Sequence, residues 1–314
     1  MSTRIEWADS TWNPIIGCSK VSPGCDNCYA ERMAFRQTKM RPHGPYDDVI
    51  HLCKGWNGKT RFVPEALDKP LHWRKPQRIF VCSMGDIAHE TVPFHDTQLI
   101  FDLTRMAPQH TYLFLTKRPH LLATHIFHYF DGHRGGTVDI PPNWHIGVTA
   151  ENQEQADKRI PILLSIPAAV RFVSIEPMLG PVDLGSIAVD MGNGLFGDCL
   201  HPHHVPYEGG KGQHRTYAHL NHVIVGGESG PGARPMHPDW AKSVQMQCEA
   251  AEVPFLFKQW GEWVQNCLCG RPTPCRTIQR PSPGLPGVMF RCGKAKSGRE
   301  LYGRTWDQYP EVPA

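Results

Sequence analysis

The sequence has no apolar run long enough to cross a membrane. No stretch approaches the roughly 18 consecutive apolar residues that suggest a spanning helix. The first residues, MSTRIEWADSTW, lack the apolar core of a secretion signal. We therefore expect a cytoplasmic protein without membrane contact.

An excess of charge of one sign is also missing. Lys and Arg number 33 against 30 Asp and Glu, which gives a formal net charge of +3. A surface that follows a phosphate backbone needs a local cluster of Lys and Arg rather than a slight global excess. Charge alone therefore leaves the partner open, and the 40% apolar content is typical of a globular protein.

Cysteine, in contrast, is plentiful, with 11 in 314 residues. In a chain without an export signal, reduced thiols and metal ligands explain these residues better than disulfides do. Three of them, Cys18, Cys25 and Cys28, lie in the segment GCSKVSPGCDNCYAERM, which has no fourth cysteine. This loop follows the first expected strand and precedes a helix that is expected to begin near Tyr29.

Three thiolates on one short loop can hold three irons of a four-iron cluster and leave the fourth iron open to a small molecule. Pro23 and Gly24 permit the turn that brings Cys25 and Cys28 to the side of Cys18. The helix start adds partial positive charge beside an anionic cluster. A zinc site completed by a histidine or a later cysteine is the main alternative to the favoured iron–sulfur cluster, and three unliganded thiols are the other.

Short β-rich runs recur along the chain, each followed by polar or glycine-containing residues and by a stretch that can be helical. This alternation predicts an α/β fold with a parallel sheet, favoured as a partial or complete (β/α) TIM-type barrel. A doubly wound open sheet is the alternative. The expected strands are Trp12 to Gly17, Ile79 to Ser83, Thr111 to Thr116, His145 to Thr149, Val170 to Ile175, His222 to Val225 and Val253 to Lys258.

Two regions interrupt this alternation. Residues 186–221 are rich in glycine and histidine and are expected to form a long insertion before the sixth strand. Residues 264–314 contain several cysteines and end in a basic tail. We therefore expect a domain at 1–263 that carries the insertion, followed by a C-terminal extension at 264–314.

These two regions also hold candidates for a second metal, either zinc or a second cluster, because thiolate and imidazole are the expected ligands. Neither set of candidates has a familiar spacing. The sets are Cys267, Cys269, Cys275 and Cys292 in the C-terminal segment, and Cys199, His201, His203 and His204 in the insertion.

The basic tail combines Lys and Arg residues with Trp306 and Tyr309. Positive charge and stacking surface together can contact a phosphodiester backbone. A solvated terminal extension is the alternative.

Several segments carry a resemblance to a known family. They are TWNPIIGCSKVSPGCDNCYAERMA, GVTAENQEQADKRIPILLSIPA, SIEPMLGPVDL, GGESGPGARPMHPDW, FKQWGEW and GKAKSGRELYGRTWDQYP. Together they resemble the phage Gp37/Gp68 family, a radical S-adenosylmethionine-like group with a three-cysteine motif that is distantly similar to spore photoproduct lyase. The resemblance covers most of the chain and implies a radical S-adenosylmethionine barrel with a [4Fe–4S] cluster. The six residues between Cys18 and Cys25, against three in the usual superfamily motif, depart from that pattern.

By this resemblance, groups at the ends of the strands bind S-adenosylmethionine. The backbone from Ser83 to Gly85 and the Asp86 side chain are expected to receive the methionine amine, with a helix N-cap as the alternative for Asp86. Lys117 or Arg118 is expected to pair with the methionine carboxylate. A substrate phosphate, or a place in a solvated loop, is the alternative for these two residues.

Further strand ends complete the expected site. Thr149, Glu151 and Asn152 suit the ribose hydroxyls, with a helix cap as the alternative for one of them. Glu176 and Glu228 are the expected catalytic residues, which orient the ribose or exchange a proton with substrate.

The function implied by the resemblance is a radical enzyme. S-adenosylmethionine would yield a 5′-deoxyadenosyl radical that abstracts a hydrogen from substrate, with an electron from an external donor. Modification or repair of nucleic acid or a nucleotide is favoured by analogy with the DNA-repair lyase and by the phage association. A zinc-stabilised nucleic-acid-binding accessory protein and a radical enzyme on a small molecule or peptide are the alternatives.

Overall fold

A computed structural model describes residues 3, 5–51, 55–131, 140–190, 196–202, 204–206, 214–216, 218–265, 276–279 and 288–311 of the chain. The chain divides into two compact units. The first unit comprises Met1–Val148, Ile166–Val170 and Val312–Ala314, and the second comprises Thr149–Ser165 and Arg171–Glu311. In the described part of the chain, no helix is long and apolar enough to cross a membrane.

The main sheet has seven strands in the order β1-β6-β7-β8-β9-β14-β15. The neighbours with a described register pair in parallel. The bounds are β1 (Ser10–Trp12), β6 (Arg78–Val81), β7 (Thr111–Thr116), β8 (Trp144–Thr149), β9 (Val170–Ile175), β14 (His222–Gly226) and β15 (Phe255–Gln259). Six of the expected strands are present in this sheet, while the first lies earlier than expected and shares only Trp12 with the prediction. The prediction of an α/β fold with a parallel sheet is confirmed.

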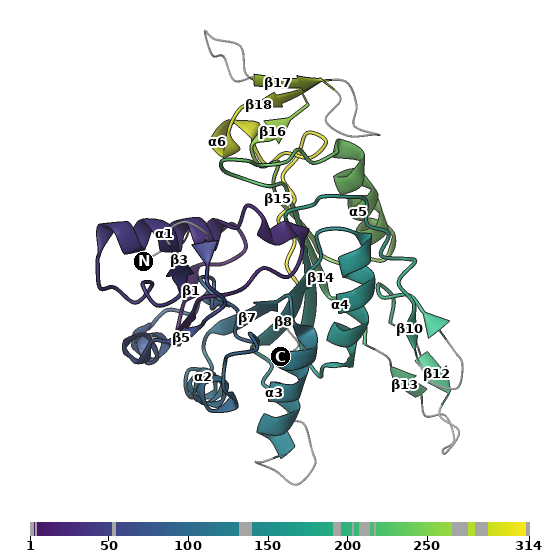
Figure 1. Cartoon of the computed structure of the whole chain (residues 1–314). Coiled ribbons are helices and arrows are strands. Elements are labelled where there is room, and N and C mark those ends of the chain that lie inside the picture. Colours follow the sequence, from purple (N-terminus) through teal and green to yellow (C-terminus); the bar gives the residue numbers. More distant parts are fainter. Residues whose placement is uncertain are drawn as a thin grey trace. The chain divides into compact units, whose positions relative to one another are not determined.

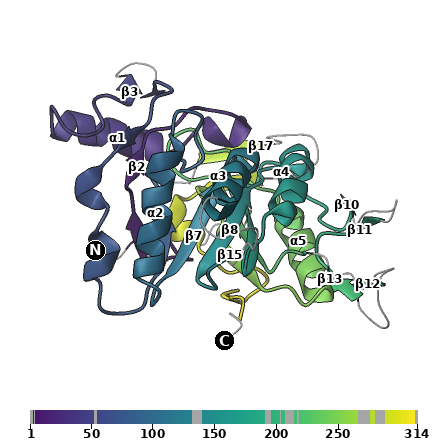
Figure 2. The same ribbon diagram turned by 90° about the horizontal axis from the view of Figure 1, so that it is seen from below.

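The first unit contains β1, β6, β7 and most of β8, connected by α2 (Phe94–Met106) and α3 (Pro119–Asp131). Figures 1 and 2 show these helices beside β7 and β8. The strands are nearly continuous apolar runs because both faces of a parallel sheet are covered. Trp144 of β8 shows the packing: its ring lies 4.6 Å from that of Phe101 on α2, and its indole N–H donates to Thr104 Oγ1 at 2.8 Å.

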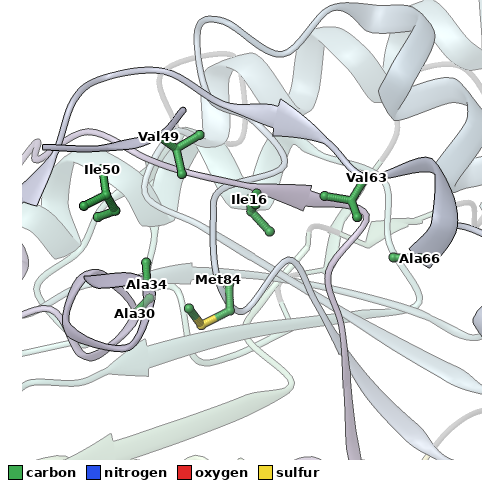
Figure 3. Close-up of a cluster of buried hydrophobic side chains, with 8 residues drawn as sticks. All are labelled: Ile16, Ala30, Ala34, Val49, Ile50, Val63, Ala66 and Met84. Atoms are coloured by element: carbon green, nitrogen blue, oxygen red, sulfur yellow. The ribbon is translucent and has the colours of Figure 1, made fainter. Parts of the chain in front are cut away.

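The segment between β1 and β6 in the sequence forms a smaller layer of short strands, turns and one helix. The expected first strand divides into β1 and β2 (Ile15–Ile16), and β2 pairs antiparallel with β5 (Arg61–Phe62). A hairpin of β3 (Ile50–His51) and β4 (Gly55–Trp56) contacts α1 (Tyr29–Met40). Short 3₁₀ turns lie at Pro23–Cys25 (η1), Pro64–Ala66 (η2) and Lys69–His72 (η3). Figure 3 shows the apolar cluster of this layer, in which Ala30 and Ala34 of α1 face Met84 and Ile50.

The second unit contains most of β9, with β14 and β15 and the helices α4 (Gln153–Ser165) and α5 (Pro238–Ala250). The expected insertion contains two antiparallel pairs, β10 (Val189–Asp190) with β11 (Phe196–Gly197) and β12 (His204–Pro206) with β13 (His214–Thr216). The C-terminal segment adds β16 (Trp263–Val264), β17 (Arg276–Gln279), β18 (Val288–Arg291) and α6 (Lys294–Ser297).

The basic tail packs against the second unit. Phe257 N–H donates to the Trp306 carbonyl at 3.0 Å, and Leu256 bridges Asp307 in antiparallel fashion along β15. Trp306 is 8% exposed, its ring lies 5.7 Å from that of Phe255, and the Arg304 guanidinium lies over it at 3.3 Å. Trp306 is therefore buried rather than available to stack on a base, whereas the residues directly before and after it are exposed.

A buried histidine in β8 predicts that stability depends on pH. Burial lowers the pKa of His145 from 6.5 to about 4, and its Nε2 has no hydrogen-bond partner among the described residues. The unfolded chain binds the proton more tightly, so this stability is present above about pH 6.5 and is lost as the pH falls toward 4. We expect the free energy of unfolding to fall by about 2 kcal/mol between pH 7.5 and pH 5. Denaturant melts of the wild type and of His145→Gln at both pH values measure it; an equal fall in the two would contradict the assignment.

Candidate functional site

The three-cysteine loop is fixed against the turn that follows β6. Gly17 has a φ of +92° and donates its N–H to the Met84 carbonyl at 3.0 Å. Gly17 and Gly85 form a parallel bridge, and a Cβ on Gly85 would lie 2.9 Å from the Gly17 carbonyl oxygen. The two backbones therefore approach so closely that only glycine fits at these positions. This contact places Cys18 beside the carboxyl end of β6.

The other two cysteines are set by short local turns. Cys25 ends η1 and donates its N–H to the Ser22 carbonyl at 2.9 Å, and Cys28 N–H donates to the Cys25 carbonyl at 3.3 Å. Cys28 is the N-cap of α1, which begins at Tyr29 as expected. All three cysteines are free and partly exposed, and their charges interact pairwise.

The Cys28 sulfur lies at the positive end of α1. The backbone N–H groups of Glu31 and Ala30 hydrogen-bond to it, as does the Trp56 side chain. Burial nevertheless raises the pKa of the Cys28 thiol, and the charge of Cys25 adds to the rise. A protein that holds Cys28 as a thiolate therefore needs a further positive charge at this sulfur.

Lys117, in the loop after β7, reaches the Cys25 sulfur. Its Nζ lies 3.5 Å from Cys25 Sγ and 3.1 Å from Ser22 Oγ. Burial raises the pKa of Cys25, but the Lys117 charge and hydrogen bonds from residues 21 and 22 outweigh it, so that the pKa is lowered. Cys25 is therefore the one thiol of the three whose surroundings favour the thiolate.

Arg118 connects Cys18 to the turn after β6. All five N–H groups of this buried guanidinium have acceptors. Nε donates to Glu90 (2.7 Å), Nη1 to Asp86 (3.0 Å) and Cys18 Sγ (3.9 Å), and Nη2 to Ser19 Oγ (2.6 Å) and the Ser19 carbonyl (3.4 Å). Burial and the Asp86 charge raise the pKa of the Cys18 thiol to about 12, against the opposing charge of Arg118.

The residues expected to bind the methionine moiety are thus engaged within the protein. Lys117 and Arg118 both point at the cysteine loop, and Arg118 has no N–H left for a carboxylate. Asp86 accepts hydrogen bonds from Thr116 Oγ1 (2.7 Å) and from the N–H of Ala88 (3.0 Å) in addition to Arg118. Its carboxylate therefore closes its own turn and neutralises Arg118.

The strand-end backbone is also engaged. The Ser83 carbonyl accepts from Tyr29 Oη at 2.7 Å, and Ser83 Oγ donates to Asn13 Oδ1 at 3.1 Å. Because a carbonyl oxygen has two lone pairs, the Ser83 carbonyl can still accept a hydrogen bond from an amine.

Ser19 and His89 are residue types that can form a nucleophile and its general base, but their hydrogen bonds run in the wrong direction for that role. His89 Nδ1 accepts from the Thr91 N–H at 3.2 Å, so the ring proton lies on Nε2 and is donated to Ser19 Oγ at 2.9 Å. Ser19 Oγ also accepts from Arg118. Since both neighbours donate to the hydroxyl, neither removes its proton, and the pair holds the loop rather than activating Ser19.

In the second unit, the residues that follow β8 anchor α4. Asn152 Oδ1 accepts from the Gln155 N–H at 3.1 Å, which confirms that one of the three residues expected to bind ribose is a helix cap. Glu151 is fully buried and pairs with Arg159 at 3.1 Å, and Arg159 also donates to the Thr149 carbonyl at 2.7 Å. These contacts engage the side chains of Glu151 and Asn152 and the backbone carbonyl of Thr149.

Glu176 and Lys258 form a partly exposed ion pair in the second unit, at the ends of β9 and β15. Lys258 Nζ lies 2.7 Å and 2.9 Å from the two Glu176 oxygens. Gln259 Nε2 donates to Glu176 (3.3 Å) and to the Gly227 carbonyl (2.8 Å), which fixes the orientation of the amide. Its Oε1 is buried and lacks a partner among the described residues. The pair offers both a carboxylate and an ammonium group.

The other expected catalytic residue, Glu228, is buried and neutralised by Arg234. The Arg234 backbone N–H and its Nε and Nη2 donate to the Glu228 carboxylate at 2.8, 2.9 and 2.6 Å. Of the two expected catalytic carboxylates, Glu176 is therefore the more accessible, with a side-chain exposure of 18% against 4% for Glu228.

Those candidates for a second metal that the structure describes do not form a metal site. Cys267, Cys269, Cys275 and His203 lie outside the described residues. Contrary to the expectation of reduced thiols, Cys292 is disulfide-bonded. Within the part of the chain that the structure describes, no three His, Cys, Asp or Glu side chains already converge as ligands of a metal ion, and this holds for the expected ligands Cys18, Cys25 and Cys28 as well.

Ser19, Trp56, His89 and Glu90 belong to the site but were not expected from the sequence. Trp56 comes from a hairpin and shares no motif with the cysteines. His89 and Glu90 lie within four residues of Asp86, and this closeness in the sequence is the signal that could have placed them in the site.

The structure describes an α/β protein with a parallel main sheet and a three-cysteine loop beside the carboxyl end of β6. A family model described as a protein of unknown function (DUF5131) matches residues 2–310, and the chain belongs to this DUF5131 family. Neither a curated protein nor a solved structure matches it.

Proposed function

We propose that this protein binds a [4Fe–4S] cluster through Cys18, Cys25 and Cys28 and is a radical S-adenosylmethionine enzyme. One observation carries the proposal: each of the three sulfurs has its own N–H donors, from Arg118, from Lys117 and from the start of α1. Hydrogen bonds and positive charge around cysteine sulfurs stabilise an anionic cluster and set its potential.

Without a metal, the surroundings of Cys18 and Cys28 favour the neutral thiol, so the charge of a bound cluster would have to hold these two sulfurs as thiolates. Arg118 is 2% exposed, and placing a cation there requires anions nearby. Asp86 and Glu90 supply two of them, and a Cys18 thiolate would supply a third. A structural zinc site is normally closed by a fourth protein ligand. The imidazole that contacts this loop, His89, is already engaged by Ser19 and Thr91.

When bound, the cluster and S-adenosylmethionine would supply a 5′-deoxyadenosyl radical. The chain's own residues would position these groups: Lys117 and Arg118 hold the loop and balance its charge, and the Ser83 carbonyl can accept from the methionine amine. In the second unit, Glu176 and Lys258 can orient a polar substrate or exchange a proton with it. The parallel sheet is compatible with a partial barrel of the radical S-adenosylmethionine kind.

Nucleic acid or a nucleotide is the proposed substrate. The support is the resemblance to the phage Gp37/Gp68 family and, through it, to a DNA-repair lyase, which is an analogy of fold and motif. DNA binding that weakens steeply with salt concentration would support this class, because phosphate contacts release counterions. Salt-independent binding of a small molecule or peptide would favour the other substrate classes.

The test is a metal and product analysis under anaerobic conditions. We expect a brown protein with about four iron and four sulfide per chain. With dithionite and S-adenosylmethionine, it should release 5′-deoxyadenosine. A colourless protein that contains zinc would contradict the cluster, and a brown protein that releases no 5′-deoxyadenosine would contradict the radical chemistry while leaving the cluster intact.

A further inference from the structure

One face of α1 carries large apolar side chains that are exposed to solvent. Tyr29, Met33 and Met40 are 43%, 46% and 75% exposed. At 3.6 residues per turn, these three residues and Arg36 lie within about 60° of the helix circumference. The buried face of the helix, with Ala30 and Ala34, is a separate one (Figure 3). We call Tyr29, Met33, Arg36 and Met40 the α1 stripe.

The stripe is flanked by positive charge. From Tyr29 to Arg41 the chain has four basic residues and one acidic residue, Glu31, which pairs with Lys20 at 3.3 Å. Arg36, Lys39 and Arg41 are exposed. Since the formal net charge of the whole chain is only +3, positive charge is concentrated here.

The stripe begins at the cysteine loop. Tyr29 follows Cys28 directly, and Val21, inside the loop, is also exposed, at 43%. Both views of the ribbon place α1 at the outer edge of the first unit (Figures 1 and 2). A partner on the stripe would therefore lie next to the proposed ligand Cys28.

Resting on the proposed function, we infer that the α1 stripe is the docking surface for a small acidic electron-carrier protein that reduces the cluster. The proposed reaction requires one electron from outside the chain for each S-adenosylmethionine cleaved, and the carrier is oxidised when it gives up that electron to the cluster. Exposed apolar side chains with an arginine among them suit the centre of a protein interface, and the surrounding basic residues attract an acidic partner.

A protein partner fits these side chains better than nucleic acid does. Methionine is adaptable and enriched at protein interfaces, whereas nucleic-acid interfaces are more polar. The stripe has two methionines and a single aromatic ring, so it offers little of the stacking surface that single-stranded nucleic acid requires.

The experiment compares two reductants of the anaerobically reconstituted protein. The variant is Met33→Glu with Arg36→Glu. The matched control is Met106→Glu with Lys75→Glu, which changes an exposed methionine at the end of α2 and an exposed lysine in the same unit. Reduced flavodoxin is the acidic protein donor, and dithionite is the small-molecule donor. The rate of cluster reduction is measured by stopped flow as the loss of the cluster's visible absorbance.

We expect dithionite to reduce wild type, variant and control at equal rates. Flavodoxin should reduce the stripe variant at least about tenfold more slowly than the other two, and added salt should slow the wild type. Equal rates with flavodoxin would overturn the docking surface.

Two other outcomes also overturn it. A protein without a cluster, recognised by its iron content before any donor is added, removes the proposed function and the electron carrier together. A stripe variant that loses DNA binding in fluorescence anisotropy but keeps its rate with flavodoxin would assign the stripe to nucleic acid.

Discussion

Replacing Cys18, Cys25 or Cys28 with alanine is expected to abolish the cluster and all formation of 5′-deoxyadenosine. Each sulfur would hold a different iron, so two remaining thiolates cannot retain a four-iron cluster with an open site. Bound iron should fall from about four per chain to well below one in each variant. Iron and sulfide analysis after anaerobic reconstitution, followed by product chromatography, measures the loss.

Cys82→Ala is the matched control. Cys82 lies directly after β6, is free and 2% exposed, and burial raises its thiol pKa to about 12. It is therefore a cysteine of the same unit that is not part of the loop, and its removal should leave the iron content unchanged. Thermal melts of the apo forms separate loss of ligand from loss of fold, because the loop variants should melt within a few degrees of the apo wild type. A loop variant that keeps its full iron content would remove that cysteine from the ligand set.

The strands and the cysteine loop could be predicted from the sequence because both depend on local patterns. Runs such as Thr111–Thr116 are apolar over their whole length, as strands covered on both faces must be, and the structure places β7 at these residues. Likewise, the start of α1 directly after Cys28 follows from the loop and the helical residues beyond it.

The role of Arg118 could not be predicted in the same way. Two basic residues after a strand are equally compatible with a ligand carboxylate, a phosphate or solvent. The choice depends on Asp86, Glu90 and Ser19, which meet only after β6, β7 and the loop have come together. A contact between residues about 100 positions apart leaves no signal in the spacing of either segment.

The C-terminal tail shows the same limit. Its composition of basic and aromatic residues suggested a surface for nucleic acid or a solvated extension. The structure instead buries Trp306 against Phe255 and pairs the tail with β15. An edge strand presents unpaired N–H and C=O groups with which another segment can pair, and composition does not reveal that pairing.

Arg118→Met is expected to destabilise the protein by about 3 to 5 kcal/mol, because it leaves the buried carboxylate of Asp86 without its cation. Chemical denaturation of the apo protein measures this. Lys158→Met is the control: Lys158 and Glu154 form an exposed pair on α4, and its loss should cost about 0.5 kcal/mol or less.

The double variant Asp86→Asn with Arg118→Met separates a buried charge from lost packing. Neutralising residue 86 removes the unpaired carboxylate, and Glu90, whose side chain is 54% exposed, can return to water. We therefore expect the double variant to be more stable than Arg118→Met alone, with a coupling free energy of about 1 to 3 kcal/mol. If the two substitutions are additive, the Asp86–Arg118 pair does not hold the turn after β6 to the loop. If they are coupled and the double variant still fails to bind iron, Arg118 is needed for its N–H groups at Cys18 and not for stability alone.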